Sequence, residues 1–177
     1  MKLLMGSVLP LCGMLLGLGV NGARAGVIVR FDPPAQTVQL HDVFTVDLVA
    51  DLGEPVIGWG LDVQYDGLLL SAMGSPVIGS SWISASAADG DGLAALAFPS
   101  EISGTGVRLA TLTLSADAQG LVELLASATP GDGSEGFPLF ASGFADVTFM
   151  PGQVTVVPEP LTGWWLAFGW LLIRRRF

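Results

Sequence analysis

The sequence is poor in the side chains that most enzyme chemistry uses. Its 177 residues contain a single cysteine, Cys12, a single histidine, His41, and a single lysine, Lys2. A cysteine and histidine pair or a Schiff-base lysine would need a residue that occurs only near the N-terminus, and a multi-histidine metal site needs more than one histidine. A Ser-His-Asp triad would have to use His41, and no Gly-x-Ser-x-Gly motif supplies its nucleophile. These absences exclude most catalytic classes.

Charge is also scarce, at 13% of residues, about half of the usual share in soluble domains. Five of the seven basic residues lie in the first 25 or last four positions, so residues 26–157 hold 2 basic and 15 acidic side chains and a net charge of −13. Arg30 and Arg108 are the two that remain. Because phosphate backbones require a basic surface, we expect no nucleic-acid partner.

The first 25 residues have the three parts of a secretory signal peptide. Lys2 supplies a basic start, residues 3–20 carry no charge, and Ala23 and Ala25 form a small-residue A-x-A end. We therefore predict an exported protein that signal peptidase cuts after Ala25. The cut would also remove the single cysteine. The alternative is a retained membrane anchor, which the glycines of this segment disfavour.

The last 20 residues form a second pattern of three parts. Pro158-Glu159-Pro160 is followed by the uncharged run 161–173 and then by Arg174-Arg175-Arg176. The 13 residues of the run would span about 20 Å as a helix, against about 30 Å of bilayer hydrocarbon. Its three tryptophans suit the membrane interface and the arginines follow the positive-inside rule. We predict a short transmembrane segment that anchors the preceding domain on the periplasmic side.

The order of motif, apolar segment and arginine cluster resembles the PEP-CTERM sorting signal of bacteria that have an outer membrane and make exopolysaccharide. The resemblance implies a temporary anchor, which an integral-membrane exosortase recognises and cuts near Pro158-Glu159-Pro160. It further implies release to the cell surface or an extracellular matrix, in association with exopolysaccharide or a surface protein. Leu161 departs from the Ser or Ala that is commoner after the motif. The alternative is a plain C-terminal membrane tail.

Residues 26–157 show the alternation of half-buried strands. Phe44, Val46, Leu48 and Ala50 form one apolar series, and Trp59, Leu61, Val63 and Tyr65 form another. Clusters of Gly, Pro, Asp and Ser separate such segments. We expect about nine strands, near 27–31, 36–40, 43–50, 57–65, 77–85, 93–98, 107–116, 121–128 and 146–157, with a break at Pro151-Gly152. An all-β, antiparallel β-sandwich without an amphipathic helix is the predicted fold.

The order of these segments resembles a cohesin-type jelly-roll sandwich, which is related in fold to some cellulose-binding modules. The most similar part is Tyr65-Asp66-Gly67 followed by three leucines, with Gly106 to Leu114 later in the chain. The resemblance implies a binding module. Dockerin binding, which a cellulosomal cohesin would imply, does not transfer, because no recognition surface is matched residue by residue.

Two loops, Asp89-Gly90-Asp91-Gly92 and Asp132-Gly133-Ser134-Glu135, and one aromatic side chain are candidate binding sites. Asp89-Gly90-Asp91-Gly92 begins like a calcium loop, but the twelfth position is Ser100 where an EF-hand has Glu, so a turn is the favoured interpretation and calcium the alternative. Trp82 follows Gly79-Ser80-Ser81 and is the candidate exposed ligand contact.

Our main hypothesis is an exported, non-enzymatic envelope or matrix protein without a resident cofactor. A carbohydrate-binding or cohesin-like protein-binding module is the alternative from the binding class. A glycosidase that uses two of the many carboxylates is the enzymatic alternative. His41 is interpreted as a turn residue.

Overall fold

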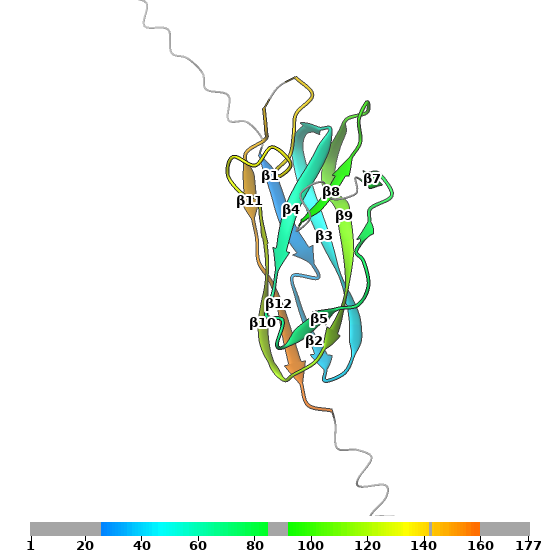
Figure 1. Ribbon diagram of the computed structural model, residues 1–177, viewed down its shortest axis with the longest axis vertical. Helices are drawn as coiled ribbons and strands as arrows, with labels where there is room; N and C mark the ends of the chain where they lie inside the picture. Colours follow the sequence, from blue (N-terminus) through cyan, green and yellow to red (C-terminus); the bar gives the residue numbers. More distant parts are fainter. Residues whose placement is uncertain (1–25, 85–91, 142, 160–177) are drawn as a thin grey trace, which may run out of the picture.

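The computed structural model describes residues 26–84, 92–141 and 143–159. These residues form twelve strands and no helix, and the strands make two curled sheets (Figure 1). None of these described residues belongs to a helix of the length and apolar character that crossing a bilayer requires. The predicted signal peptide, residues 1–25, and the apolar run 161–173 lie outside the described residues.

The strands follow one another along the chain with short connections. They are β1 (Val27–Asp32), β2 (Ala35–Gln39), β3 (Val43–Val56), β4 (Gly58–Gln64), β5 (Leu70–Ala72), β6 (Val77–Ile78), β7 (Ile83–Ser84), β8 (Leu93–Leu96), β9 (Ile102–Ala116), β10 (Gly120–Ser127), β11 (Val147–Phe149) and β12 (Gly152–Val157). The first sheet has the order β11-β1-β3-β9-β5, with β6 also paired to β9, and the second has the order β2-β12-β10-β4-β8-β7.

The predicted β-sandwich is confirmed, with more strands than the sequence pattern indicated. Residues 77–85 hold two short strands because a turn at 79–82 interrupts them, and 146–157 divides at Pro151 as expected. The three-residue β5 lies in a segment for which no strand was predicted. Most pairs are antiparallel, but β11 runs parallel to β1 and β2 runs parallel to β12, because the chain passes from the first sheet to the second at Asp32-Pro33-Pro34.

The longest ladder joins β3 to β9. It runs from Val43 opposite Ser115 to Val56 opposite Ile102, and its register shifts lie between Leu48 and Val56. Its inward residues Val46, Leu48 and Ala50 are almost fully buried, as the alternation predicted. His41 precedes β3 in a turn with a φ of 69°, which confirms its interpretation as a turn residue.

The core lies between the two sheets and also holds one loop. Trp59, Phe31 and Phe137 are its largest fully buried side chains. Phe137 belongs to the segment between β10 and β11, which pairs with the edge of β4 at Gly60. A methyl group on Gly60 would lie 1.9 Å from the carbonyl oxygen of Ser134, so only glycine lets this segment lie against β4.

The two ends of the described domain lie at opposite ends of an elongated body. Gly26 precedes β1 at one end, and β12 delivers Pro158 and Glu159 to the other (Figure 1). The β3 to β4 turn and the loops after β8 and around Phe140 therefore lie at the end far from Glu159.

Candidate functional site

Trp82, the candidate ligand contact, is in fact part of the core. Its side chain is 6% exposed, and its ring meets Trp59 edge-on at a centroid distance of 6.3 Å. Its Nε1 donates a hydrogen bond of 3.0 Å to the carbonyl oxygen of Arg108. The prediction was wrong because the turn that begins at Gly79 directs the ring inward and leaves Ser80 and Ser81 on the surface.

The other predicted positions are described only in part. Pro158 and Glu159 are exposed directly after β12, whereas Pro160, the three C-terminal arginines, Ala23, Ala25, Asp89 and Asp91 lie outside the described residues. Their roles stay predictions. Within the described ranges, no three His, Cys, Asp or Glu side chains are grouped so that they could hold a metal ion.

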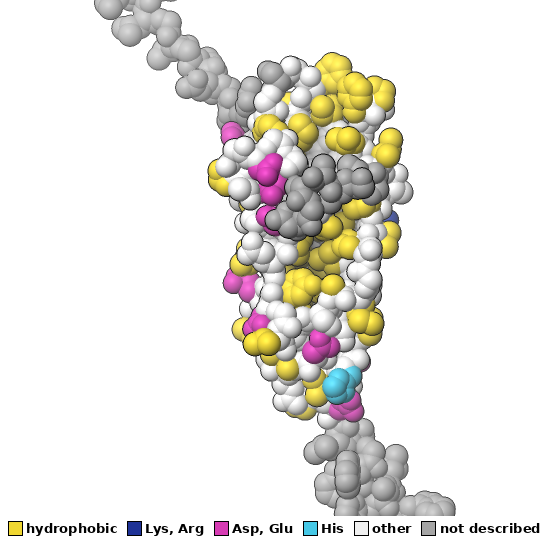
Figure 2. Space-filling view, in the orientation of Figure 1, with side chains coloured by type: hydrophobic (Ala, Val, Ile, Leu, Met, Phe, Trp, Pro, Cys, Tyr) yellow, Lys and Arg dark blue, Asp and Glu magenta, His cyan; other side chains and the backbone are white. Residues whose placement is uncertain are grey.

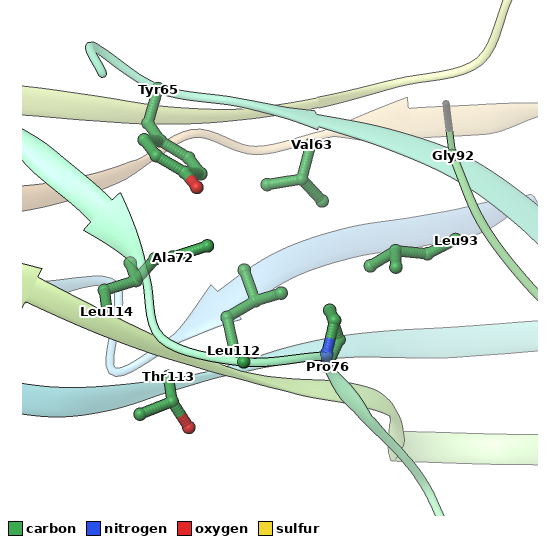
Figure 3. A pocket seen from close by; sticks show the side chains of 10 residues that line it. Val63, Tyr65, Ala72, Pro76, Gly92, Leu93, Leu112, Thr113 and Leu114 are labelled. Atoms are coloured by element: carbon green, nitrogen blue, oxygen red, sulfur yellow. The ribbon is translucent and has the colours of Figure 1, made fainter. Parts of the chain in front are cut away.

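A small apolar pocket opens between the sheets beside Tyr65 (Figure 3). Val63 and Leu93 from the second sheet face Leu112 and Leu114 from β9 across it. Its volume is about 150 Å³, below the range of about 300–1,000 Å³ in which ligand pockets usually fall. We interpret it as a packing gap at the open side of the sandwich.

A larger feature is an exposed apolar surface at the end of the body far from Glu159, which we call the apolar end face. It comprises Ile83, Leu96, Phe98 and Phe140, with exposed fractions of 68%, 47%, 58% and 59%. Figure 2 shows hydrophobic side chains gathered at this end. Single exposed apolar residues are ordinary, whereas a contiguous group marks an interaction site.

Strand pairing makes the apolar end face continuous. Ile83 on β7 lies opposite Leu96 on β8, and Leu96 in turn lies opposite Gly58 on β4. A methyl group on Gly58 would meet the Leu96 side chain at 2.8 Å, so the glycine leaves room for Leu96 to lie flat on β4. Phe98 follows two residues after Leu96, and its ring stacks on Phe140 at 6.4 Å with an interplanar angle of 17°.

The sequence carries a signal for this face in the segment that forms β8 and the residues after it. Along residues 95–98, small and large side chains alternate, and the structure turns the small ones inward. Ala95 and Ala97 are 0% and 8% exposed, whereas Leu96 and Phe98 face solvent. Because this segment buries alanines and exposes leucine and phenylalanine, the isolated domain removes less apolar area from water than the opposite orientation would. Exposure of such large apolar side chains is typical of a surface that a partner covers.

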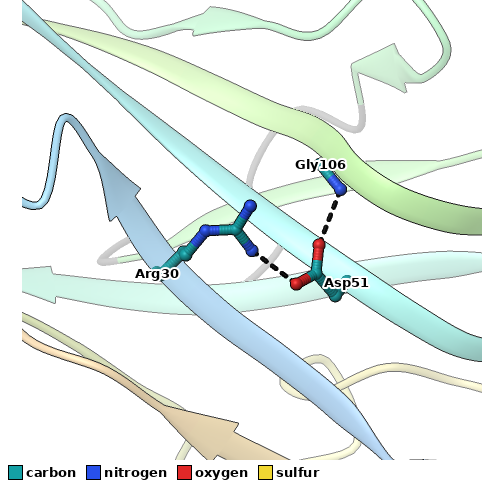
Figure 4. Close-up of polar contacts among 3 residues, drawn as sticks. All are labelled: Arg30, Asp51 and Gly106. Atoms are coloured by element: carbon teal, nitrogen blue, oxygen red, sulfur yellow. Dashed lines mark hydrogen bonds and ion pairs between the residues drawn. The ribbon is translucent and has the colours of Figure 1, made fainter.

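The outer face of the first sheet carries polar groups, and one carboxylate there connects β1, β3 and β9. Asp51 accepts a hydrogen bond of 2.7 Å from Nη1 of Arg30 on β1 and one of 2.6 Å from the amide of Gly106 on β9 (Figure 4). These two hydrogen bonds, that from the Arg30 guanidinium first, lower the pKa of Asp51 below its ordinary value of 3.8. Gly106 has a φ of 64°, so the carboxylate holds a backbone conformation that other residues rarely adopt.

Comparison with known structures agrees with this architecture. A non-cellulosomal cohesin from the archaeon Archaeoglobus fulgidus matches with a TM-score of 0.55 and 14% identity over 75% of this chain and 90% of the cohesin. The cohesin module of a family 33 glycoside hydrolase from Clostridium perfringens matches with a TM-score of 0.57 and 13% identity over 76% and 97%. A type II cohesin from Acetivibrio cellulolyticus, solved in a complex with an X-dockerin, matches with a TM-score of 0.50 and 11% identity over 75% and 99%.

At these identities the comparisons show the fold alone, which is a cohesin-like β-sandwich. No protein-family model matches the chain, and no curated protein matches it either.

The Asp51 contacts predict a pH-dependent contribution to stability. Because the pKa of Asp51 is lowered in the folded protein, the contribution is present above the ordinary value of 3.8 and is lost as the pH falls through the folded pKa. Both partners are about one third exposed, so we expect Asp51→Asn to reduce the unfolding free energy by at most about 1 kcal/mol at neutral pH. Thermal unfolding of the two proteins should converge as the pH falls below 3.8.

Glu123→Gln on β10 is the matched control, since this exposed carboxylate lies on the second sheet. A difference between Asp51→Asn and the unmodified protein that stays constant with pH would contradict the assignment.

Proposed function

We propose that this chain is an exported, non-enzymatic interaction module that binds a protein partner on its apolar end face. The observation that carries the proposal is the exposure of Leu96 and of the stacked Phe98 and Phe140 at one end of the sandwich. Exposed aromatic rings supply large contact area at a low cost in side-chain entropy, and they are frequent anchors of protein interfaces. One of the similar structures is a type II cohesin in complex with an X-dockerin. It supports the same class of function for this domain, which is the binding of a protein partner.

The charge of the domain indicates what kind of protein fits. With a net charge of −13 on residues 26–157, two copies of this chain repel each other, and a partner with basic residues around an apolar centre is favoured. We therefore propose a hetero-partner of basic character. The same charge opposes the homodimer that an exposed apolar patch otherwise favours.

We further propose that the two ends of the chain are an export signal and a sorting signal, as their sequence patterns predict. The first strand begins at Val27, so a cut after Ala25 would leave β1 whole. Pro158 and Glu159 directly follow β12 and are exposed, as a protease or sorting enzyme requires. A tail held in the membrane would present the apolar end face away from it, because that face lies at the opposite end of the body. Release by an exosortase would then deliver the module to the cell surface or the polysaccharide matrix.

A photo-crosslinking experiment tests the partner. The full chain is expressed in its host with p-benzoylphenylalanine at position 98 or 140, which replaces one aromatic ring by another. Position 68 is the control, because Leu68 is 84% exposed and follows β4 at the other end of the body. We expect one adduct of defined mass from positions 98 and 140, and its loss when Leu96→Asp is added.

The proposal fails if position 68 gives the same adduct, or if neither aromatic position gives any adduct.

The sorting proposal has its own test. Replacement of Pro158-Glu159-Pro160 by three alanines should leave the domain folded and keep the protein in the membrane fraction, because the processing enzyme no longer recognises the junction. Fractionation of cells and medium measures this, with Glu123→Gln as a control that also removes one negative charge. Release of the triple variant at the normal rate would contradict a PEP-CTERM signal and leave a plain tail.

A further inference from the structure

The outer face of the first sheet carries a polar groove that the proposed protein interface does not use. Its volume is about 520 Å³, within the usual range for ligand sites. Strands β1, β3 and β9 and the turn after β6 line it, and the lining residues include Asp32, Asp47, Val49, Ser80, Ser81 and Arg108. None of these residues belongs to the apolar end face.

The floor of the groove is apolar. Val49 lies between Arg30 on β1 and Arg108 on β9 in the ladder, so its side chain shares their outward face. It is nevertheless only 5% exposed and does not belong to the main core cluster. Val107 and Ile102 add further apolar surface on the β9 side.

Hydrogen bonds fix the backbone on both sides of the groove. On one side, Asp51 fixes the amide of Gly106 (Figure 4). On the other, the amide of Gly79 donates to the carbonyl oxygen of Leu109 at 2.8 Å, and Trp82 donates to that of Arg108. A methyl group on Gly79 would lie 2.1 Å from the Arg108 oxygen, so a glycine is required for this approach.

The buried Trp82 therefore has a structural role that explains its position. It ties the turn of Ser80 and Ser81 to β9, and the two serines project at the rim of the groove. A turn that is fixed by a core tryptophan presents its hydroxyl groups in one arrangement, which lowers the entropy lost when a ligand binds.

The polar groups of the groove are unpaired or only partly paired. Asp32 and Asp47 lie directly opposite each other on β1 and β3. Asp47 accepts a hydrogen bond from Thr111, whereas the side chains of Asp32 and Arg108 have no hydrogen bond or ion pair with any described residue. Like charges directly opposite in a sheet repel each other and destabilise it. A ligand that donates hydrogen bonds to both carboxylates would therefore reduce this repulsion.

This set of groups selects a neutral, polyhydroxylated ligand. Carboxylates accept hydrogen bonds from hydroxyl groups, the guanidinium of Arg108 donates to ring and hydroxyl oxygens, and the serine and threonine hydroxyls do both. An anionic ligand is disfavoured by the two carboxylates and by the net charge of −13 on residues 26–157. A bound metal ion is disfavoured because the described residues offer no group of three ligating side chains.

The geometry points to a neutral oligosaccharide site in this groove, with Asp32, Asp47 and Arg108 as the directional contacts and Val49 beneath the sugar ring. The groove is lined mainly by strands of the first sheet, whereas Ile83 and Leu96 of the apolar end face lie on strands of the second sheet, and Ser81 at the rim lies two residues before Ile83. This inference does not depend on the proposed protein interface.

An array of neutral, uronic-acid and sulfated glycans probed with the full chain tests the inference. We expect binding to one or more neutral oligosaccharides, and calorimetric titration with the best of them should give a dissociation constant that is at least tenfold weaker in Arg108→Ala. Ser81→Trp, which fills the exposed rim without touching the core, should abolish binding. Glu123→Gln on the other sheet should change nothing.

Two results would overturn the inference. They are the absence of any neutral glycan among the bound probes, whether or not acidic glycans bind, and neutral binding that survives both Arg108→Ala and Ser81→Trp. Circular dichroism of each variant confirms that the sandwich is intact, and Phe98→Ala should bind the glycan normally even if it loses the protein partner.

Discussion

The pairing of β3 with β9 is the constraint on which the rest of the structure depends. These are the two longest strands, of 14 and 15 residues, and their ladder joins residues more than 45 positions apart in the chain. β1 pairs with one side of this ladder, and β5 and β6 pair with the other. The inward side chains of the ladder meet Trp59 and Phe137, so the core exists only once these distant segments are paired.

The register shifts of this ladder also produce the polar surface. Where the pairing slips between Leu48 and Leu52, the twist increases and β9 passes through Gly104 and Gly106 with positive φ. Asp51 holds this irregular part to β1 and β9 at once. The second sheet differs, because small residues on its inner side leave Leu96 and Phe98 outside. One sheet therefore presents oriented polar groups, and the other presents apolar area for a partner.

The regular part of this fold was predictable from alternation alone. Strand positions, the buried faces of β3 and β4 and the turn at His41 follow from local pattern and turn chemistry. Trp82 was not predictable, because whether a turn residue faces in or out depends on the β9 carbonyl that its indole reaches. The burial of Phe137 was missed for a similar reason, since the three phenylalanines of the segment 130–145 follow no strand or helix period that would say which of them faces the core. The apolar end face was missed because alternation predicts two faces and does not say which one meets the core.

We propose that this acidic, cohesin-like domain binds a protein partner at the end of the second sheet. Amide hydrogen exchange of the full chain, measured alone and with a protein extract of the host envelope, tests it most directly because it surveys every surface at once. The account predicts slower exchange confined to residues 93–98 and 137–141. Slower exchange only in other segments, or none anywhere, would contradict it.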